Sequence, residues 1–174
     1  MGVLYRCGLK SCPHFCSPCE SYDFNFKCPI GEIDENGFDE IYDENNEFFC
    51  LIVGTRTFND YSFLANKMDK ILASKQGKRI IIVSGGAKGT DSLAERYALE
   101  RDYKLYVINA DWDGAKAKGR PKSAGYIRNE DMHKFIAAHN DRGCVAFWDG
   151  ISKGTSHSIE LAKKYNNQIR LIKV

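Results

Sequence analysis

Residues 79–101 read RIIIVSGGAKGTDSLAERYALER, which places an apolar run, a glycine-rich turn and an amphipathic segment in immediate succession. The run 79–83, which is β-branched from Ile80 to Val83, has the composition of a strand that is buried on both faces. Residues 90–101 have the apolar spacing of a helix, with Thr90 or Asp91 placed to cap it. A strand that passes through a tight turn into a helix is half of a βαβ unit, so this stretch predicts an α/β fold.

The same alternation extends outward in both directions. The further expected elements are a strand at 48–53, a helix at 61–75, a strand at 104–109, a helix at 123–139, a strand at 143–148, a helix at 155–166 and a last strand at 168–174. Together they predict a Rossmann-like three-layer α/β sandwich, in which a mostly parallel five-stranded sheet carries helices on both faces. Cys50 and Cys144 fall inside apolar runs and are interpreted as small core residues.

The chain divides into three parts by composition. We expect a Cys-rich segment at 1–30, an acidic linker at 31–47 and the Rossmann-like domain at 48–174. Residues 1–47 hold 3 basic and 10 acidic residues, a net charge of −7, whereas residues 48–174 hold 22 basic and 13 acidic residues, a net charge of +9. A basic domain favours an anionic ligand, and both nucleotides and nucleic acid meet this condition.

The composition is that of a soluble globular protein, with 43% hydrophobic and 28% charged residues. No apolar run approaches the roughly 18 residues that a membrane-spanning helix needs. Residues 1–10 lack the continuous apolar stretch of a secretory signal. We therefore expect a cytoplasmic protein without a membrane partner.

The Cys-rich segment contains Cys7, Cys12, Cys16, Cys19 and Cys28, with His14 among them. Only Cys16 and Cys19 have the two-residue separation that is typical of a zinc knuckle. A structural zinc ion held by four of these side chains is the leading interpretation, because a metal gives a short segment a fixed shape without an apolar core. Disulfides and unligated thiols are the alternatives. The main domain is expected to require no cofactor.

Three of the expected strands end in turns that combine glycine with hydroxyl or basic residues, at 54–57, 84–91 and 149–156. The carboxyl ends of parallel strands meet at one edge of the sheet, where ligands bind in folds of this kind. Each turn leads towards a helix, whose N-terminus presents unpaired N–H groups and a partial positive charge that suit a phosphate. Glycine lets the backbone approach the anion closely, although such turns also need glycine for purely structural reasons. Neither the Walker A pattern nor the dinucleotide pattern GxGxxG is present.

The connection 110–122 contains four basic residues among glycines and is expected to be a mobile cationic loop. After it, Arg128 stands near the start of a helix, where its guanidinium can bind a phosphate or carboxylate through two hydrogen bonds. Trp112 and Tyr126 offer rings on which a base can stack, with simple packing as the alternative. The expected ligand-binding residues are Gly54, Thr55, Arg56, Ser84, Gly85, Gly86, Lys88, Gly89, Thr90, Asp91, Asp111, Arg128, Asn129, Gly150, Lys153, Gly154, Thr155 and Ser156.

These motifs, taken in order, resemble a known family. Segments 54–56, 83–94, 110–112, 124–132, 146–150 and 153–155 are similar to motifs of YspA/YpsA-related domains of the SLOG superfamily, and the resemblance covers essentially all of residues 48–174. The resemblance implies a Rossmannoid fold shared with DprA/Smf proteins, LOG enzymes and TIR-linked sensor domains. It also implies a nucleotide or nucleotide-derived ligand of the NAD, ADP-ribose or cyclic-nucleotide type, and a homodimer, since dimers are common in the superfamily.

One departure from the LOG enzymes bears on catalysis. LOG-type phosphoribohydrolases carry a glutamate in a PGGxGTxxE motif, and the resemblance aligns Ser158 with that glutamate. Glu160 lies two residues further along, roughly 200° around a helix, so it cannot take the same place. Hydrolysis by the LOG route is therefore disfavoured, and whether the protein is an enzyme is left open.

Three functions remain in view at this point. The leading hypothesis is a sensor or binding module for a nucleotide-derived small molecule. The alternatives are an enzyme that hydrolyses or transfers part of such a nucleotide, and DprA-like binding of nucleic acid.

Overall fold

A computed structural model of the chain describes residues 46–120 and 123–174. The five cysteines considered for zinc and residues 31–45 of the expected acidic linker lie outside the described residues. The elements in chain order are β1 (Glu47–Gly54), α1 (Tyr61–Leu72), the 3-10 turn η2 (Ala73–Lys75), β2 (Arg79–Ser84), α2 (Thr90–Glu100), β3 (Lys104–Val107), α3 (Trp112–Ala117), α4 (Ala124–Ala137), β4 (Arg142–Trp148), α5 (Lys153–Lys164) and β5 (Ile169–Lys173).

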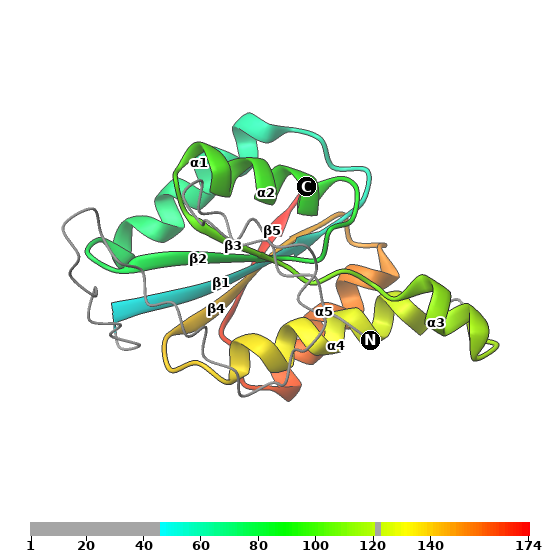
Figure 1. Cartoon of the computed structure of the whole chain (residues 1–174). Helices are drawn as coiled ribbons and strands as arrows, with labels where there is room; N and C mark the ends of the chain where they lie inside the picture. Colours follow the sequence, from blue (N-terminus) through cyan, green and yellow to red (C-terminus); the bar gives the residue numbers. More distant parts are fainter. Residues whose placement is uncertain (1–45, 121–122) are drawn as a thin grey trace, which may run out of the picture.

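The five strands form one sheet in the order β3-β2-β1-β4-β5, and every neighbouring pair is parallel. Helices α1 and α2 cover one face of the sheet, and α4 and α5 cover the other (Figure 1). The predicted Rossmann-like three-layer fold is confirmed. None of the helices in the described ranges combines the length and the apolar character that crossing a membrane requires.

Strand β1 forms the centre of the core because both of its faces are apolar. Phe48, Cys50 and Ile52 pack in the cluster under α1 and α2. The alternate residues Phe49, Leu51 and Val53 pack in the cluster under α4. Leu51 and Ile52 are fully buried, and burial of such a side chain contributes about 2 kcal/mol relative to an exposed one. Because both faces of β1 are covered by helices, the strand needs a continuous apolar run.

The chain direction reverses at the centre of the sheet. From β1 the chain moves outward through β2 to β3, and it then returns to add β4 and β5 on the opposite side of β1. The loops that follow β1 and β4 therefore diverge towards opposite faces and leave a crevice at the carboxyl ends of these strands.

The connection 110–122 differs from the expected loop, because it contains helix α3. The Asp111 side chain caps this helix by accepting a hydrogen bond from the backbone N–H of Gly114 at 2.8 Å. The six-residue helix WDGAKA is too short to show an apolar period, and Gly114 disfavours a helix in isolation. Burial of Gly114 and Ala115 against the protein supplies the missing stability.

Two helix starts also differ from those expected. Helix α2 has Gly89 as its N-cap residue with no side-chain cap, so neither Thr90 nor Asp91 caps it as the sequence suggested. Helix α5 begins at Lys153, two residues before the expected start, because Ser152 serves as its N-cap.

Candidate functional site

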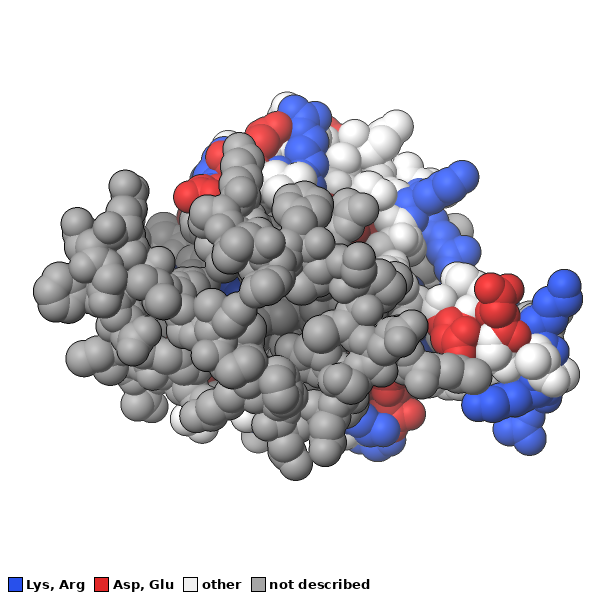
Figure 2. All heavy atoms as spheres, in the orientation of Figure 1, with Lys and Arg blue, Asp and Glu red and all other residues white. Residues whose placement is uncertain are grey.

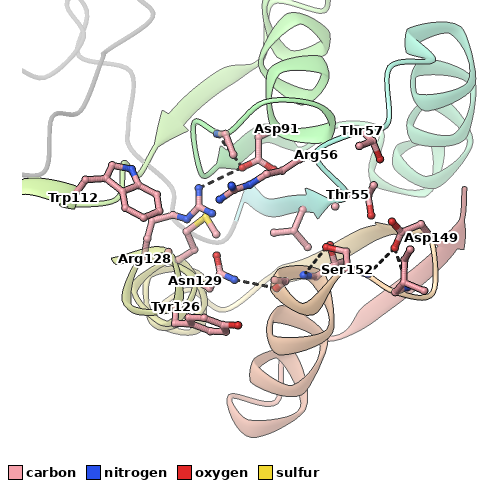
Figure 3. A pocket seen from close by; sticks show the side chains of 18 residues that line it. Thr55, Arg56, Thr57, Asp91, Trp112, Tyr126, Arg128, Asn129, Asp149 and Ser152 are labelled. Carbon is pink, nitrogen blue, oxygen red and sulfur yellow. Dashed lines mark hydrogen bonds and ion pairs between the residues drawn. The ribbon is translucent and has the colours of Figure 1, made fainter. Parts of the chain in front are cut away.

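A cleft of about 450 Å³ opens at the carboxyl ends of β1 and β4 (Figure 3). Its walls come from the β1 loop, the starts of α2, α3 and α4, and the turn between β4 and α5. The expected ligand-binding residues that line it are Gly54, Thr55, Arg56, Asp91, Arg128, Asn129, Gly154 and Thr155. The lining also includes Val53, Thr57, Ala87, Trp112, Gly125, Tyr126, Met132, Asp149, Ile151 and Ser152.

The other expected ligand-binding residues do not line this cleft. Gly150, Lys153 and Ser156 line a smaller hollow beside it. Ser84, Gly85, Gly86, Lys88, Gly89, Thr90 and Asp111 line neither space. The structure thus brings together parts of the first and third glycine turns but keeps most of the second turn out of the cleft.

Contacts within the protein explain why the second turn, at 84–91, needs glycine at positions 85 and 89. A Cβ on Gly85 would collide with the guanidinium of Arg128, and a Cβ on Gly89, which has φ +78°, would collide with the backbone of Arg56. The backbone N–H of Thr90 donates to the Thr55 carbonyl at 3.3 Å, and the Thr90 hydroxyl donates to the same oxygen at 3.1 Å. The N-terminus of α2 is therefore directed at a protein carbonyl.

A buried ion pair between Arg128 and Asp91 forms one wall of the cleft. Nη1 of Arg128 lies 3.5 Å from Oδ2 of Asp91, and the two side chains are only 10% and 6% exposed. Nη1 also donates to the carbonyl of Gly85, while the backbone N–H of Ala87 donates to Oδ2 of Asp91 at 3.2 Å. These contacts join the start of α4 to the turn that precedes α2.

The pKa values of this pair reflect burial. Burial raises the pKa of Asp91 to about 6, although the charge of Arg128 and the Ala87 N–H act in the opposite direction. Burial also lowers the pKa of the Arg128 guanidinium, against the effect of the Asp91 charge. Nε of Arg128 is buried and has no hydrogen-bond partner within the part of the chain that the structure describes. An unpaired buried donor in the wall of a cleft costs free energy unless a ligand or water supplies an acceptor.

The opposite wall is the turn that leads into α5. Oδ1 of Asp149 accepts hydrogen bonds from the backbone N–H groups of Ile151 at 3.0 Å and Ser152 at 2.8 Å, and these bonds lower the pKa of Asp149. The Ser152 hydroxyl accepts from the Thr155 N–H at 3.4 Å. The position of the turn is set by side-chain contacts to its own backbone.

The first turn of α5 presents bare backbone to the cleft. The side-chain amide of Asn129 donates to the Gly154 carbonyl at 3.1 Å and so ties α4 to this turn. The N–H groups of Lys153 and Gly154 have no acceptor inside the helix, as at every helix start. A Cβ on Gly154 would meet nothing within 4 Å, so no packing constraint requires glycine there.

Two aromatic rings stand at the rim. Trp112, at the start of α3, is 50% exposed, and Tyr126, on the first turn of α4, is 44% exposed. In Figure 3, Trp112 lies beside Arg128 and Tyr126 lies beside the first turns of α5. The Tyr126 ring packs edge-to-face against His157, with ring centroids 4.8 Å apart.

The Ser158 position, which the resemblance aligns with the LOG glutamate, faces away from the cleft. Ser158 is 1% exposed, and its hydroxyl lies 2.7 Å from Nε2 of His133. The amide of Asn167 contacts the same histidine at 3.2 Å from Nδ1 and accepts from Nε of Arg142 at 2.9 Å. Burial, with a smaller effect of His157, lowers the pKa of His133 to about 4, so its ring is neutral at pH 7. This polar chain joins α4 to α5 and supplies nothing to the cleft.

The expected ligand-binding residues do not include several that line the cleft, among them Thr57, Asp149 and Ser152. Asp149 and Ser152 had a detectable signal, since an Asp three residues before a Ser at a strand end is typical of a capped turn. No sequence signal marks the pairing of His133 with Ser158. Within residues 46–120 and 123–174, no group of three or more His, Cys, Asp or Glu side chains is arranged to hold a metal ion.

Solved structures with a similar fold include DNA processing protein A from Helicobacter pylori, which was studied for its mode of binding single-stranded DNA. The TM-score is 0.50 at 23% identity, over 74% of this chain and 66% of that chain, which establishes the fold alone. A predicted subunit of tRNA methyltransferase from Methanocaldococcus jannaschii aligns with a TM-score of 0.38 at 18% identity, over 71% of this chain and 67% of that chain.

Sequence comparison is more specific. The family model for the YspA, cpYpsA-related SLOG family matches residues 50–114, from β1 to the start of α3. The Gene 61 protein of Mycobacterium phage D29 is 31% identical over 115 residues, which cover 66% of this chain and 87% of the phage protein. The chain therefore belongs to the YspA, cpYpsA-related SLOG family.

Proposed function

We propose that this protein binds a nucleotide or a nucleotide-derived small molecule in the cleft at the carboxyl ends of β1 and β4. The observation that carries the proposal is the convergence of Arg56, Arg128 and the open first turn of α5 on one cleft of about 450 Å³. This volume is within the range of about 300–1,000 Å³ that small-molecule sites occupy. The cleft also lies at the reversal of the sheet, where open α/β folds bind their ligands.

The phosphate end of the ligand belongs at α5. The unpaired N–H groups and the helix dipole both favour an anion at this point. Gly154 leaves room for a phosphate oxygen to approach the backbone. Arg56 is exposed at the cleft and supplies a positive charge from the opposite wall. The base or another flat group would then rest on Trp112 or Tyr126 at the rim.

The side chains that line the cleft favour binding of the ligand over its chemical conversion. Of the carboxylates that line the cleft, Asp91 is paired with Arg128 and Asp149 holds the α5 turn. Ser158 is buried at the α4–α5 interface, so that position offers no carboxylate to a glycosidic bond. This arrangement supports a sensor or binding module. The raised pKa of Asp91 favours an enzyme as the second candidate, because a carboxyl group that titrates near neutrality can exchange protons with a ligand.

Binding of single-stranded nucleic acid is a further candidate, supported by a different surface. Lys and Arg side chains gather around the projecting end of α3, with acidic residues beside them (Figure 2). Lys116, Lys118 and Arg120 are exposed there, and the exposed Trp112 begins the same helix. The structural neighbour from Helicobacter pylori binds single-stranded DNA.

Thermal unfolding in the presence of candidate ligands separates these functions. The full chain is screened against NAD, ADP-ribose, cyclic nucleotides, nucleoside monophosphates and a single-stranded oligonucleotide, with mass spectrometry of each mixture. A rise in Tm with the small molecule intact supports a binding module, and loss of the parent molecule supports an enzyme. A response to the oligonucleotide alone would defeat the small-molecule proposal.

The matched variants are Arg56→Ala and Arg170→Ala. Arg170 is an exposed arginine on β5 that lines neither the cleft nor the hollow. Loss of one charge-assisted hydrogen bond costs about 1.5–3 kcal/mol, so Arg56→Ala should weaken binding by about tenfold or more. Arg170→Ala should leave binding unchanged, and equal effects of the two substitutions would place the ligand elsewhere.

A further inference from the structure

The amino ends of the strands form the end of the domain opposite the cleft, and basic residues extend across it. Strands β2, β3 and β4 begin with Arg79, Lys104 and Arg142. In the sheet order β3-β2-β1-β4, these three starting points span about 15 Å at the usual distance between strands. Strands β1 and β2 begin at the left in Figure 1. We call Arg79, Lys104 and Arg142 the basic row.

Two further lysines lie just before β2. Nζ of Lys75 and Nζ of Lys78 approach the two carboxylate oxygens of Asp141 to 2.8 Å and 2.6 Å, so two ammonium groups share one carboxylate. Nε of Arg79 lies 3.9 Å from Oε1 of Glu47, the first residue of β1. The basic row and these neighbours together hold five basic and two acidic side chains, a net charge of +3.

Lys104 and Arg142 contact neutral groups. Nε of Arg142 donates to the Asn167 amide oxygen at 2.9 Å, and Nη1 donates to the His139 carbonyl at 2.6 Å. The ammonium group of Lys104 lies 5.4 Å from the centroid of the Tyr106 ring. A helix dipole favours a lysine in the last turn of a helix, but these two residues begin strands. Their positive charges therefore suit an anionic partner at this end of the domain.

The acidic segment 31–45 is attached to the chain at this same end. It contains seven acidic residues and no basic residue, and it stops two residues before β1 begins. Phe38, Ile41 and Tyr42 lie among the carboxylates and give the segment apolar area that a purely solvated linker lacks. A flexible chain of seven residues, such as 39–45, spans about 15 Å on average, which matches the width of the basic row. The cleft lies at the far end of β1, about 25 Å away.

We propose that the acidic segment docks on the basic row and covers the amino ends of the strands of its own domain. Opposite charge and the short connection to β1 favour this position over Arg56 and Arg128 in the cleft. A segment docked there shields the basic row from other polyanions, such as nucleic acid, and leaves the cleft open. The proposal does not depend on which ligand the cleft binds.

Zero-length crosslinking of the full chain with a carbodiimide, followed by mass spectrometry, tests the proposal. The reagent joins a lysine only to a carboxylate that contacts it. We expect carboxylates of the acidic segment to be joined to Lys75, Lys78 and Lys104. Lys88 and Lys116, which are exposed on the loop after β2 and on α3, should be joined to the segment at least fivefold less often.

A charge reversal separates docking from mere proximity along the chain. Lys104→Glu should lower the crosslinks between the segment and Lys75 at least threefold, whereas the matched control Lys88→Glu should leave them unchanged. In the wild-type protein, about 1 M NaCl should lower them to a similar extent, because it screens exposed charges. The salt measurement needs no variant, so it stays decisive if Lys104→Glu fails to fold. The pair of Lys75 and Asp141 provides an internal standard for the reaction.

Three results would overturn the proposal. The first is equal crosslinking of the segment to Lys75 and Lys116, or no crosslinking of the segment while the internal standard is recovered. The second is crosslinking to Lys75 that neither NaCl nor Lys104→Glu lowers, which would show proximity alone. The third is crosslinking that joins labelled to unlabelled chains in an equal mixture of isotope-labelled and unlabelled protein, because the segment would then dock on a second copy.

Discussion

The buried pair of Arg128 and Asp91 should make a large contribution to the free energy of unfolding. Two unit charges 3.5 Å apart attract each other by about 5 kcal/mol at an effective dielectric constant of about 20. Much of this attraction offsets the cost of removing both charges from water. Removal of one partner leaves the other buried and unpaired, so Arg128→Met should lower the free energy of unfolding by about 3–5 kcal/mol.

The loss of stability caused by Arg128→Met should depend on pH, because Asp91 titrates near neutrality. Without Arg128, the pKa of Asp91 rises further above its value of about 6. A folded-state pKa above the unfolded value confers stability at low pH that is lost as the pH rises through it. The destabilisation caused by Arg128→Met should therefore be larger at pH 8 than at pH 6.

A double-mutant cycle measured by urea unfolding isolates the coupling. The wild-type protein, Arg128→Met, Asp91→Asn and the double variant are unfolded at pH 7.5, and the double variant should recover a substantial part of the loss. Arg101 and Asp69 form the control pair, because their side chains approach to 2.8 Å but are 37% and 44% exposed. Solvent screening should make the coupling free energy of the control pair much smaller than that of the buried pair, although its charged atoms are closer together. A coupling for the buried pair no larger than that of the control pair would refute this reasoning.

Two further predictions concern the turn before α2 and the response to acid. Gly89→Ala should destabilise the protein by about 2 kcal/mol more than Gly77→Ala in thermal unfolding. Both glycines have positive φ, but only at Gly89 does the new Cβ collide with backbone atoms. Equal losses for the two variants would contradict the packing described for this turn. Burial lowers the pKa of His133 to about 4, so the folded state loses stability as the pH falls from about 6.5 to 4, by up to about 3 kcal/mol. Asp91, with its pKa raised to about 6, gains stability over a similar window and offsets this loss. Asp91→Asn should therefore show a steeper loss of stability between pH 6.5 and 4 than the wild-type protein, and identical slopes in urea unfolding would disprove the compensation.

Strands β1, β2 and β4 could be predicted from the sequence because each contains an apolar run that is buried between the two helix layers. Residues 79–83 and 48–53 are examples, whereas the strand order was not predicted. The edge strands β3 and β5 are only partly buried. The short helix α3 could not be predicted, since its stability comes from the burial of Gly114 and Ala115 and not from a local apolar period. Elements with an apolar run or period of their own can thus be predicted from the local sequence, whereas α3 cannot.

The site was predicted only in part, for a related reason. Glycine turns identify the correct edge of the sheet, and Arg128 and Asn129 do line the cleft there. The sequence cannot show that Gly85 and Gly89 face Arg128 and Arg56, because those contacts join residues that are far apart in the chain. Glycines that look equivalent in sequence therefore have different roles, one set in protein packing and the other at the cleft.

Gly154→Ala tests the central claim most directly, because it separates folding from binding. The new Cβ meets no protein atom within 4 Å, and replacing glycine by alanine in a helix should stabilise the protein by about 0.5–1 kcal/mol. The same methyl group enters the cleft at the first turn of α5, where the phosphate is proposed to bind. The measurement is calorimetric titration of wild-type and Gly154→Ala protein with the nucleotide that raises the wild-type Tm most. The account predicts a higher Tm together with at least tenfold weaker binding, whereas a higher Tm with unchanged affinity would contradict it.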